Sequence, residues 1–293
     1  MNILLFGNKG QIGREIEEQC KNKNINIIGY DIDSADIVKI DQVEHAFKQN
    51  PGIDFVINTA AYTNVEKAED EPEKAYQINC KGVQNLSLTC RQYDIPLIHL
   101  STDYIFSGEK IGPYFETDTA IPLNIYGKSK LAGEEILKET WPKHIILRTS
   151  WVFGNHGNNF VKKILQLAHE RDVLNVVDDQ FGCPTAASDI ARVVLEIAEK
   201  ISQNQPIWGI YNYCNSPATT WHDFALKIIE LGNNKFPLKV KQINKTTTEY
   251  FGAKAMRPKN SELLVMKINK DYGILRKNWE DYLAEAIDFS RQA

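Results

Sequence analysis

A glycine-rich loop at the start of the chain constrains its fold more than any other feature. Gly7, Gly10 and Gly13 follow the apolar run 3–6 directly and open a helical pattern over residues 11–21. Glycines in such a turn let a pyrophosphate approach the backbone, and the helix N-terminus offers unpaired N–H groups to the anion. The loop therefore predicts a dinucleotide-binding βαβ unit, and a tight β-α turn without a ligand is the alternative.

Short apolar runs alternate with helical patterns through the first half of the chain. The runs, most of them bounded by Gly, Asn, Asp or Pro, predict buried parallel strands at residues 3–6, 25–30, 55–58, 96–100 and 144–147. The helical patterns cover residues 11–21, 43–49, 73–92 and 129–139. This alternation predicts an α/β fold with a doubly wound parallel sheet of the Rossmann type.

The alternation loosens after about residue 150. Helical patterns recur at residues 159–171, 187–200 and 220–231, a short strand candidate lies at 210–213, and the stretch 233–245 is polar and lysine-rich. We expect residues 1–150 to form the dinucleotide-binding domain. Residues 151–293 are expected to form mainly a smaller substrate-binding lobe, with segments interleaved between the two.

Charge and cysteine content narrow the class of protein. The 293 residues carry a net charge of −4 and no lysine- or arginine-rich run, which argues against a nucleic-acid partner. The five cysteines are scattered and form no C-x-x-C pair, which favours a reducing compartment over a disulfide framework or a zinc site. No apolar run approaches the roughly 18 residues of a membrane helix, and the first residues lack a signal peptide's basic region. We therefore expect a cytoplasmic enzyme with no membrane partner.

Acidic residues at predicted strand ends are candidate contacts to a nucleotide. Asp31 ends the second predicted strand, where a carboxylate either binds the adenosine ribose and favours NAD or serves as a turn former. Lys9, inside the loop, can reach a 2′-phosphate, so the choice between NADH and NADPH stays open. Asp41, after a third strand candidate, is either an adenine contact or a helix cap.

Tyr126 and Lys130 are the candidates for proton transfer. Their four-residue spacing puts both on one face of a helix. A free tyrosine has a pKa of about 10, which an adjacent ammonium and a cationic nicotinamide lower. Ser101 and Thr102 close the predicted strand 96–100, where the Thr102 hydroxyl can orient a carbonyl. Together with the loop these residues predict carbonyl reduction or alcohol oxidation, whereas an exposed tyrosine beside a solvated lysine is the alternative.

Motifs spread over nearly the whole chain carry a family resemblance. They lie at residues 58–63, 66–69, 101–106, 122–134, 148–152, 157–160, 179–185, 220–223 and 257–258. In these segments the chain resembles the extended short-chain dehydrogenases/reductases, and among them the dTDP-4-dehydrorhamnose reductase family. The resemblance implies hydride transfer from NADPH or NADH to C4 of a 4-keto-6-deoxy sugar on dTDP. The implied product is dTDP-L-rhamnose, a precursor of cell-surface polysaccharide such as O-antigen.

The resemblance also implies roles for single residues. Tyr126 is the implied proton donor, Lys130 its modulator and ribose ligand, and Thr102 the residue that orients the carbonyl. The implied cofactor contacts are Gly7, Gly10, Gln11, Ile12, Gly13, Asp31, Asp41, Ala60, Ala61, Thr63, Tyr126 and Lys130. The implied substrate contacts are Thr102, Asp103, Tyr126, Trp151, Asn159 and Arg257. Core packing for Trp151, a helix cap for Asn159 and a surface position for Arg257 are the alternatives.

Some members of the family bind Mg²⁺ at a dimer interface built from acidic side chains. Glu15 matches one such acid, with a solvated helical glutamate as the alternative. Ser188 stands where a second acid, a glutamate, is expected. We therefore assign no metal ligand and leave Mg²⁺ and a homodimer open. His222, at a predicted helix start, is expected to be structural.

Three functions remain open from the sequence. The first is the reductase, which makes rhamnose or, from the other face of the carbonyl, the C4 epimer 6-deoxytalose. The second is a nucleotide-sugar epimerase or dehydratase, but related dehydratases carry Asp-Glu after the threonine, whereas Thr102 is followed by Asp103 and Tyr104. The third is a non-catalytic subunit, since the regulatory subunit of methionine adenosyltransferase resembles the same family. Intact Thr102, Tyr126 and Lys130 disfavour the third.

Overall fold

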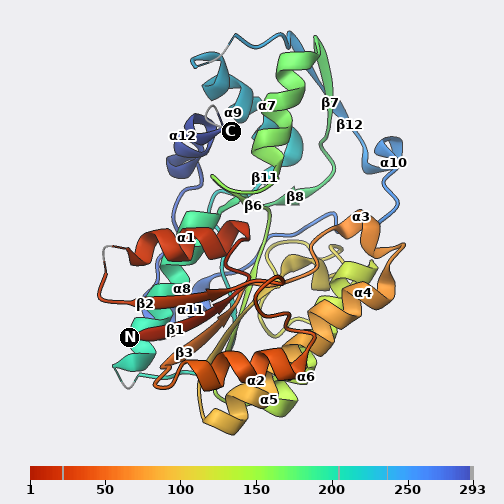
Figure 1. Ribbon diagram of the computed structural model, residues 1–293. Helices are drawn as coiled ribbons and strands as arrows, with labels where there is room; N and C mark the ends of the chain where they lie inside the picture. The colour runs from red at the N-terminus through yellow and green to blue at the C-terminus, as the bar shows by residue number, and fades with distance from the viewer. Residues whose placement is uncertain (22, 204, 236, 291–293) are drawn as a thin grey trace.

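A six-stranded parallel sheet forms the core of the larger, lower part of the protein in Figure 1. The computed structural model describes every residue except 22, 204, 236 and 291–293. The strands, in spatial order, are β10 (Gly209–Asn212), β5 (His144–Thr149), β4 (Leu97–Thr102), β3 (Phe55–Asn58), β1 (Asn2–Phe6) and β2 (Asn26–Tyr30). The predicted doubly wound parallel sheet is confirmed.

Helices cover both faces of this sheet because alternate side chains of each buried strand point to opposite sides. Ile3 and Leu5 of β1 pack in one core layer, whereas Leu4 and Phe6 pack in the other. The first layer is covered by α1 (Gln11–Cys20), α8 (Ala187–Ser202) and α11 (Met266–Tyr272). The second is covered by α2 (Ile40–Gln49), α5 (Val83–Tyr93) and α6 (Ile125–Thr140).

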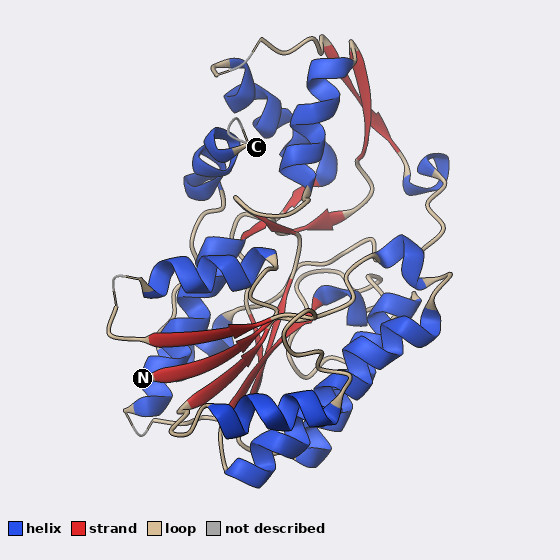
Figure 2. Ribbon diagram, in the orientation of Figure 1, coloured by secondary structure: helices blue, strands red, loops and turns tan. Residues whose placement is uncertain are grey.

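A second group of elements sits beyond the carboxyl ends of the strands (Figure 2). It has its own apolar core around Phe153, Phe224 and Leu283. Its elements are β6 (Val152–Phe153), α7 (Phe160–Glu170), β7 (Val173–Val177), β8 (Phe181–Gly182), β9 (Thr185–Ala186), β11 (Thr219–Thr220), α9 (Trp221–Asn233), β12 (Gln242–Thr246) and α12 (Glu280–Phe289). The chain also crosses back, since α8, β10 and α11 return to the large sheet.

Two stretches differ from the expected secondary structure. The polar stretch 233–245, apart from residue 236, which lies outside the described residues, leads into β12, which pairs in parallel with β7. With Ile243 as its single apolar residue, β12 has no apolar run that would mark it as a strand. The predicted helix 73–92 is divided into α4 (Pro72–Tyr76), a π-helical segment (Gln77–Gly82) and α5.

The π-helical segment has a clear local partner. Asn79 within it accepts a hydrogen bond from the backbone N–H of Tyr62 and donates to the Tyr62 carbonyl and to Ser129 Oγ of α6. Single wide turns of this kind inside a helix often occur beside functional sites. Here the wide turn ties the loop after β3 to the helix that carries Tyr126.

The remaining short elements lie on the same side as the carboxyl ends of the strands. They are α3 (Val65–Ala68), a 3₁₀ turn (Asp103–Ile105) and α10 (Thr248–Phe251). None of the helices in the described part of the chain is long and apolar enough to cross a membrane. Ligands of open α/β sheets bind at this carboxyl edge.

Candidate active site

Strand β4 and helix α6 bring the predicted catalytic residues to the carboxyl edge of the sheet. Thr102 is the last residue of β4, and its hydroxyl accepts from the backbone N–H of Tyr104 at 3.2 Å. Asn124 caps α6 by accepting from the Gly127 N–H at 2.8 Å. Tyr126 therefore lies in the first turn of α6, next to the end of β4.

Tyr126 packs, partly buried, against a small apolar cluster of Tyr62, Ala68 and Ala75. Its ring meets that of Tyr104 edge-on, with ring centres 5.6 Å apart. Burial raises the pKa of Tyr126 to about 12, and this outweighs a hydrogen bond with Thr102, which lowers it. Tyr126 therefore holds its proton at neutral pH, as a general acid must.

Lys130 is almost fully buried, one helical turn beyond Tyr126. Its Nζ donates to the Leu100 carbonyl at 2.7 Å and lies 3.3 Å from His99 Nε2. Burial lowers the pKa of Lys130 to about 8, opposed by the carboxylate of Glu134. Without a cofactor, burial dominates the pKa of Tyr126 and Lys130 is directed to β4, so the lowering of that pKa by the ammonium and a cationic nicotinamide stays a prediction.

Asp103 lies beside these groups and is 2% exposed. Burial raises the pKa of its carboxyl to about 6, although the hydroxyls of Ser261 and Thr102 oppose the shift. Thr102 Oγ1 donates to Asp103 at 3.0 Å. The arrangement brings Thr102, Asp103 and Tyr126 together, and the residue that follows Asp103 carries a phenol instead of a second carboxylate.

The glycine loop is packed tightly against its own backbone and leaves the first turn of α1 uncapped. Gly7 adopts a φ of 84°, and a Cβ at that position would overlap Ala60. A Cβ on Gly13 would overlap the Gly7 carbonyl oxygen and Asn8. Helix α1 begins after Gly10 with no side-chain cap and no acidic residue in its first turn, so its free N–H groups suit an anion. The loop therefore fits a dinucleotide phosphate.

Other predicted cofactor residues surround this loop. Gln11 Oε1 accepts from Asn159 Nδ2 at 3.1 Å, which joins the start of α1 to the start of α7. Asn159 also caps α7 by accepting from the Lys162 N–H, so the cap assigned as its alternative role is present. Ile12 packs partly buried against the first core layer.

Asp31 holds the loop from the end of β2. Its two carboxylate oxygens accept from the backbone N–H groups of Lys9 and Ile32, at 3.0 and 2.8 Å. Lys9 forms an exposed ion pair with Asp33. The turn-forming role of Asp31 is thus present, and Lys9, the cation predicted to reach a 2′-phosphate, is paired with a neighbouring acid.

The prediction that Asp41 follows a strand is wrong. Asp41 is exposed and lies in the first turn of α2, and no strand lies between β2 and α2. A strand was expected there because Ala35 and Ile37 are apolar, but they lie in a buried loop that packs in the core without strand geometry.

Asp41 nevertheless borders a hollow of about 240 Å³ beside the end of β2, lined by Tyr30, Ser34, Ala35, Asp41, Gln42, His45 and Ala46. A larger hollow of about 580 Å³ lies elsewhere, around Met1 and Ile25.

The loop after β3 contains three further predicted cofactor residues. The N–H of Ala60 donates to Asn58 Oδ1 at 3.0 Å. Ala61 is partly buried and Thr63 is exposed, whereas Tyr62 between them is buried. The loop thus presents alternate residues outward, beside the glycine loop that it touches at Gly7.

Trp151 pairs with a tryptophan that the sequence did not single out. Its ring stacks on Trp221 with centres 3.6 Å apart and planes inclined by 9°. Trp221 donates to Gln180 Oε1 at 3.0 Å. Trp151 has a φ of 46°, a left-handed conformation that costs a non-glycine residue about 1–3 kcal/mol and is typical of functional sites.

Arg257 lies in a segment clasped to α3. Arg257 Nη2 donates to Glu66 Oε1 at 2.7 Å, while Glu66 Oε2 accepts from the N–H groups of Lys254 and Ala255. Arg257 Nε is buried with no hydrogen-bond partner among the described residues. Asn124, the cap of α6, donates to the Met256 carbonyl at 2.7 Å. The guanidinium is therefore held close to the helix of Tyr126 and keeps a free donor.

Glu15, the acid suspected as a metal ligand, and Asp189, which follows Ser188 in α8, have different surroundings. Glu15 is only 6% exposed, so the solvated alternative is wrong. Burial, followed by the charges of Glu285 and Glu18, raises the pKa of Glu15 to about 7. Asp189 accepts from Arg192, Tyr213, Tyr282 and Asn215, which leaves it no capacity for an ion.

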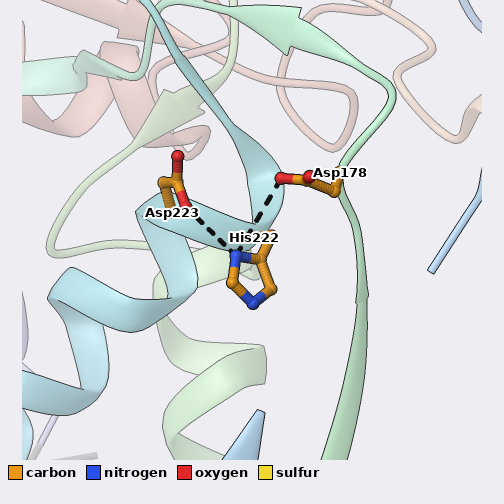
Figure 3. A group of neighbouring side chains, drawn as sticks. All are labelled: Asp178, His222 and Asp223. Atoms are coloured by element: carbon orange, nitrogen blue, oxygen red, sulfur yellow. Dashed lines mark hydrogen bonds and ion pairs between the residues drawn. The ribbon is translucent and has the colours of Figure 1, made fainter. Parts of the chain in front are cut away.

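Figure 3 shows another group, Asp178, His222 and Asp223, at the start of α9. His222 Nδ1 faces Asp223 at 3.1 Å and Asp178 at 3.9 Å. Asp178 also accepts from Thr220 and pairs with Lys245. Asp178 and His222 thus have partners within the protein, which supports a structural role for His222.

Two buried networks behind the site were not predicted. Arg148 of β5 pairs with Glu134 of α6 through Nε and Nη2, and Ser101 Oγ donates to the same carboxylate. His99 of β4 lies between Asn58 and Lys130. A signal existed, because Arg148 and His99 are polar residues inside apolar strand patterns, where an unpaired polar group is costly.

The fold and the site define a short-chain dehydrogenase/reductase, with a glycine loop on a Rossmann sheet and a Tyr-x-x-x-Lys pair at its carboxyl edge. The model of the RmlD substrate binding domain family matches residues 1–291, and the chain belongs to this family. The dTDP-4-dehydrorhamnose reductase of Aggregatibacter actinomycetemcomitans is 42% identical over 95% of both chains.

Solved structures agree with this family. The dTDP-4-dehydrorhamnose reductase of Clostridium acetobutylicum is 38% identical, with a TM-score of 0.91 over 99% of this chain and 100% of that one. The Bacillus anthracis dTDP-4-dehydrorhamnose reductase, solved in complex with NADP, is 34% identical, with a TM-score of 0.90 over 100% of this chain and 99% of that one.

Proposed function

We propose that the chain is an NAD(P)H-dependent dTDP-4-dehydrorhamnose reductase. It reduces the C4 keto group of dTDP-4-dehydro-6-deoxy-L-mannose to dTDP-L-rhamnose, the last step in making this precursor of cell-surface polysaccharide. The observation that carries the proposal is the placement of Thr102, Tyr126 and Lys130 at the carboxyl edge of the sheet. The curated relatives with the same name support it over nearly the whole chain.

The residues present divide the work of the reduction among them. Gly7, Gly10 and Gly13, with the N-terminus of α1, would hold the pyrophosphate of the cofactor. Bound NADPH or NADH supplies the hydride. The Thr102 hydroxyl orients the C4 carbonyl, and Tyr126 gives its proton to the oxygen of the developing alkoxide. Lys130, one turn further along α6, would bind the nicotinamide ribose and modulate Tyr126.

The second group of elements supplies the proposed substrate surface. We assign residues 1–150 to cofactor binding and 151–293 mainly to the dTDP-sugar. Trp151, stacked on Trp221, forms a rigid wall for the sugar, and Arg257 with its free Nε is directed to the diphosphate. Asn159 links the two parts through Gln11.

Replacing Arg257 with glutamine is expected to raise the KM for the dTDP-sugar about tenfold or more and to change kcat little. A diphosphate contact is made equally in the ground state and the transition state, so its loss weakens binding. Steady-state kinetics checks this, with Lys254→Gln as the control. Lys254 is a cation of the same segment whose exposed ion pair with Asp70 lies on the surface. An unchanged KM in Arg257→Gln would remove the diphosphate assignment.

The proposal also covers the cofactor, the cellular compartment, the oligomeric state and the metal. The NADP complex of the Bacillus anthracis enzyme supports NADPH, whereas a carboxylate such as Asp31 at the end of β2 favours NADH. We propose a cytoplasmic enzyme that acts as a homodimer. Asp189 is fully engaged within the protein and Ser188 replaces the expected acid, so this segment offers no free acid to join Glu15 as a ligand of the Mg²⁺ that some members of the family bind.

Steady-state oxidation of NADPH in the presence of the 4-keto dTDP-sugar tests the function. A reductase consumes one NADPH for each sugar reduced, whereas an epimerase or dehydratase returns the hydride and consumes none. A non-catalytic subunit shows no sugar-dependent oxidation. Net consumption with dTDP-L-rhamnose as the product supports the proposal, while 6-deoxytalose as the product would change the stereochemistry assigned at C4.

A further inference from the structure

A buried chain of hydrogen bonds lies behind Lys130. It begins at the loop after β3, where the N–H of Ala60 donates to Asn58 Oδ1 at 3.0 Å. Asn58 Nδ2 lies 3.0 Å from His99 Nδ1, and His99 Nε2 lies 3.3 Å from Lys130 Nζ. Asn58 and His99 are 0% exposed and Lys130 is 2% exposed, so solvent provides no alternative partner.

The first hydrogen bond of this network determines which atoms donate and which accept along it. Because Asn58 Oδ1 accepts from the Ala60 N–H, the other half of the amide, Nδ2, faces His99 and can only donate. His99 Nδ1 must then accept. A neutral imidazole carries one proton, so the proton of His99 is on Nε2 and is directed at Lys130 Nζ.

A donor at this position favours one form of Lys130. A neutral amine has a lone pair that can accept from His99 Nε2–H while an amine hydrogen is given to the Leu100 carbonyl. An ammonium has no lone pair, so two donors would face each other in a buried space. The direction agrees with burial, which lowers the pKa of Lys130 to about 8 and holds the pKa of His99 well below its usual value.

We propose that His99 is a positioning residue for the reduction and donates from Nε2 to the Lys130 amine. It thereby connects the loop after β3, at Ala60, to the protonation state of Lys130. This inference rests on the proposed function, because it assumes that Lys130 supports the reaction of Tyr126. His99 itself is behind the site and acts through Lys130.

The charged groups around Lys130 set the background for this effect. Glu134 of α6 favours the ammonium, but its carboxylate is shared with Arg148 of β5. His144 of β5 lies near His99 and disfavours a second positive charge there. Asp103 acts on Tyr126 rather than on Lys130. His99 is thus the polar side chain that contacts Lys130 Nζ directly among the described residues.

Nitrogen-15 NMR of the whole protein labelled at histidine tests the proposal without turnover. We expect the ring of His99 to carry its proton on Nε2, to show an unprotonated Nδ1, and not to titrate between about pH 6 and about pH 9. The signal is assigned by its loss in His99→Gln or, if that variant does not fold, by replacing the other five histidines in turn. A proton on Nδ1, or an imidazolium, would overturn the proposal even if the enzyme is a reductase.

The pH dependence of kcat/KM gives a second test. His99→Met removes the Nε2–H donor that faces Lys130 Nζ and keeps a buried side chain of similar length, so the ammonium no longer meets a second donor and persists to higher pH. We expect the basic limb of the profile, near the pKa of about 8 of Lys130, to move up by about 1 pH unit. His144→Gln, another buried histidine of the same sheet, is the control and should leave the limb in place. A limb that is unmoved or moves down in His99→Met contradicts the proposal.

Discussion

Replacing Tyr126 with phenylalanine is expected to lower turnover by about 10²-fold or more. The substitution removes the proton that the alkoxide receives at C4, and general acid catalysis is typically worth this much. Cofactor affinity should change little, because the glycine loop and the start of α1 keep their geometry. Single-turnover reduction of the 4-keto dTDP-sugar, with NADPH binding measured separately, distinguishes the two quantities.

The matched control for this variant is Tyr211→Phe. Tyr211 is a fully buried tyrosine of β10 whose hydroxyl bonds the Ile207 carbonyl and Asp271, away from the carboxyl edge. Its loss should affect stability more than turnover. Turnover in Tyr126→Phe within a factor of about three of the parent would show that another group donates the proton.

Replacing Glu134 with glutamine is expected to destabilise the protein by about 3 kcal/mol or more. The Glu134 carboxylate accepts from Arg148 Nε and Nη2 and from Ser101, with both charged side chains at most 4% exposed. A neutral amide leaves the guanidinium uncompensated in a buried space, which is the costly case for buried ion pairs. Because this pair ties α6 to β4 and β5, we expect activity to fall before the fold is lost on heating.

Chemical denaturation measures this effect against Glu196→Gln. Glu196 pairs with Arg192 at 2.9 Å on α8, where both side chains are partly exposed and Arg192 keeps Asp189. The control should lose at most about 1 kcal/mol. Equal losses in the two variants would mean that the pair between α6 and β5 does not hold the site in place.

The sequence predicts the large sheet well because its strands are buried on both faces. Such strands appear as short apolar runs, and the glycine loop fixes where the first of them ends. β12 escapes this criterion, since it pairs only with β7 and carries one apolar residue. The π-helical turn at Asn79 escapes it too, because one wide turn hardly disturbs the apolar period of the segment 73–92.

The candidate site was predicted as far as local spacing allowed. Thr102 at a strand end and the Tyr126–Lys130 pair are local patterns, and the fold places them together. The electrostatics were not local, because the pKa values of Tyr126 and Lys130 depend on burial by distant segments.

Long-range partners remained hidden for the same reason. The stacking of Trp151 on Trp221 joins residues 70 positions apart in the sequence numbering, and no periodic pattern connects them. The pairing of His99 with Lys130 likewise crosses from a strand to a helix.

Transfer of deuterium is the most direct test of the central claim. The enzyme is incubated with NADPH that carries deuterium at the transferred position of the nicotinamide and with the 4-keto dTDP-sugar, and the product is analysed by mass spectrometry and NMR. The account predicts dTDP-L-rhamnose with deuterium bound to C4, formed at a greatly reduced rate by Tyr126→Phe. A sugar without deuterium, or one whose oxidation level is unchanged, would contradict it.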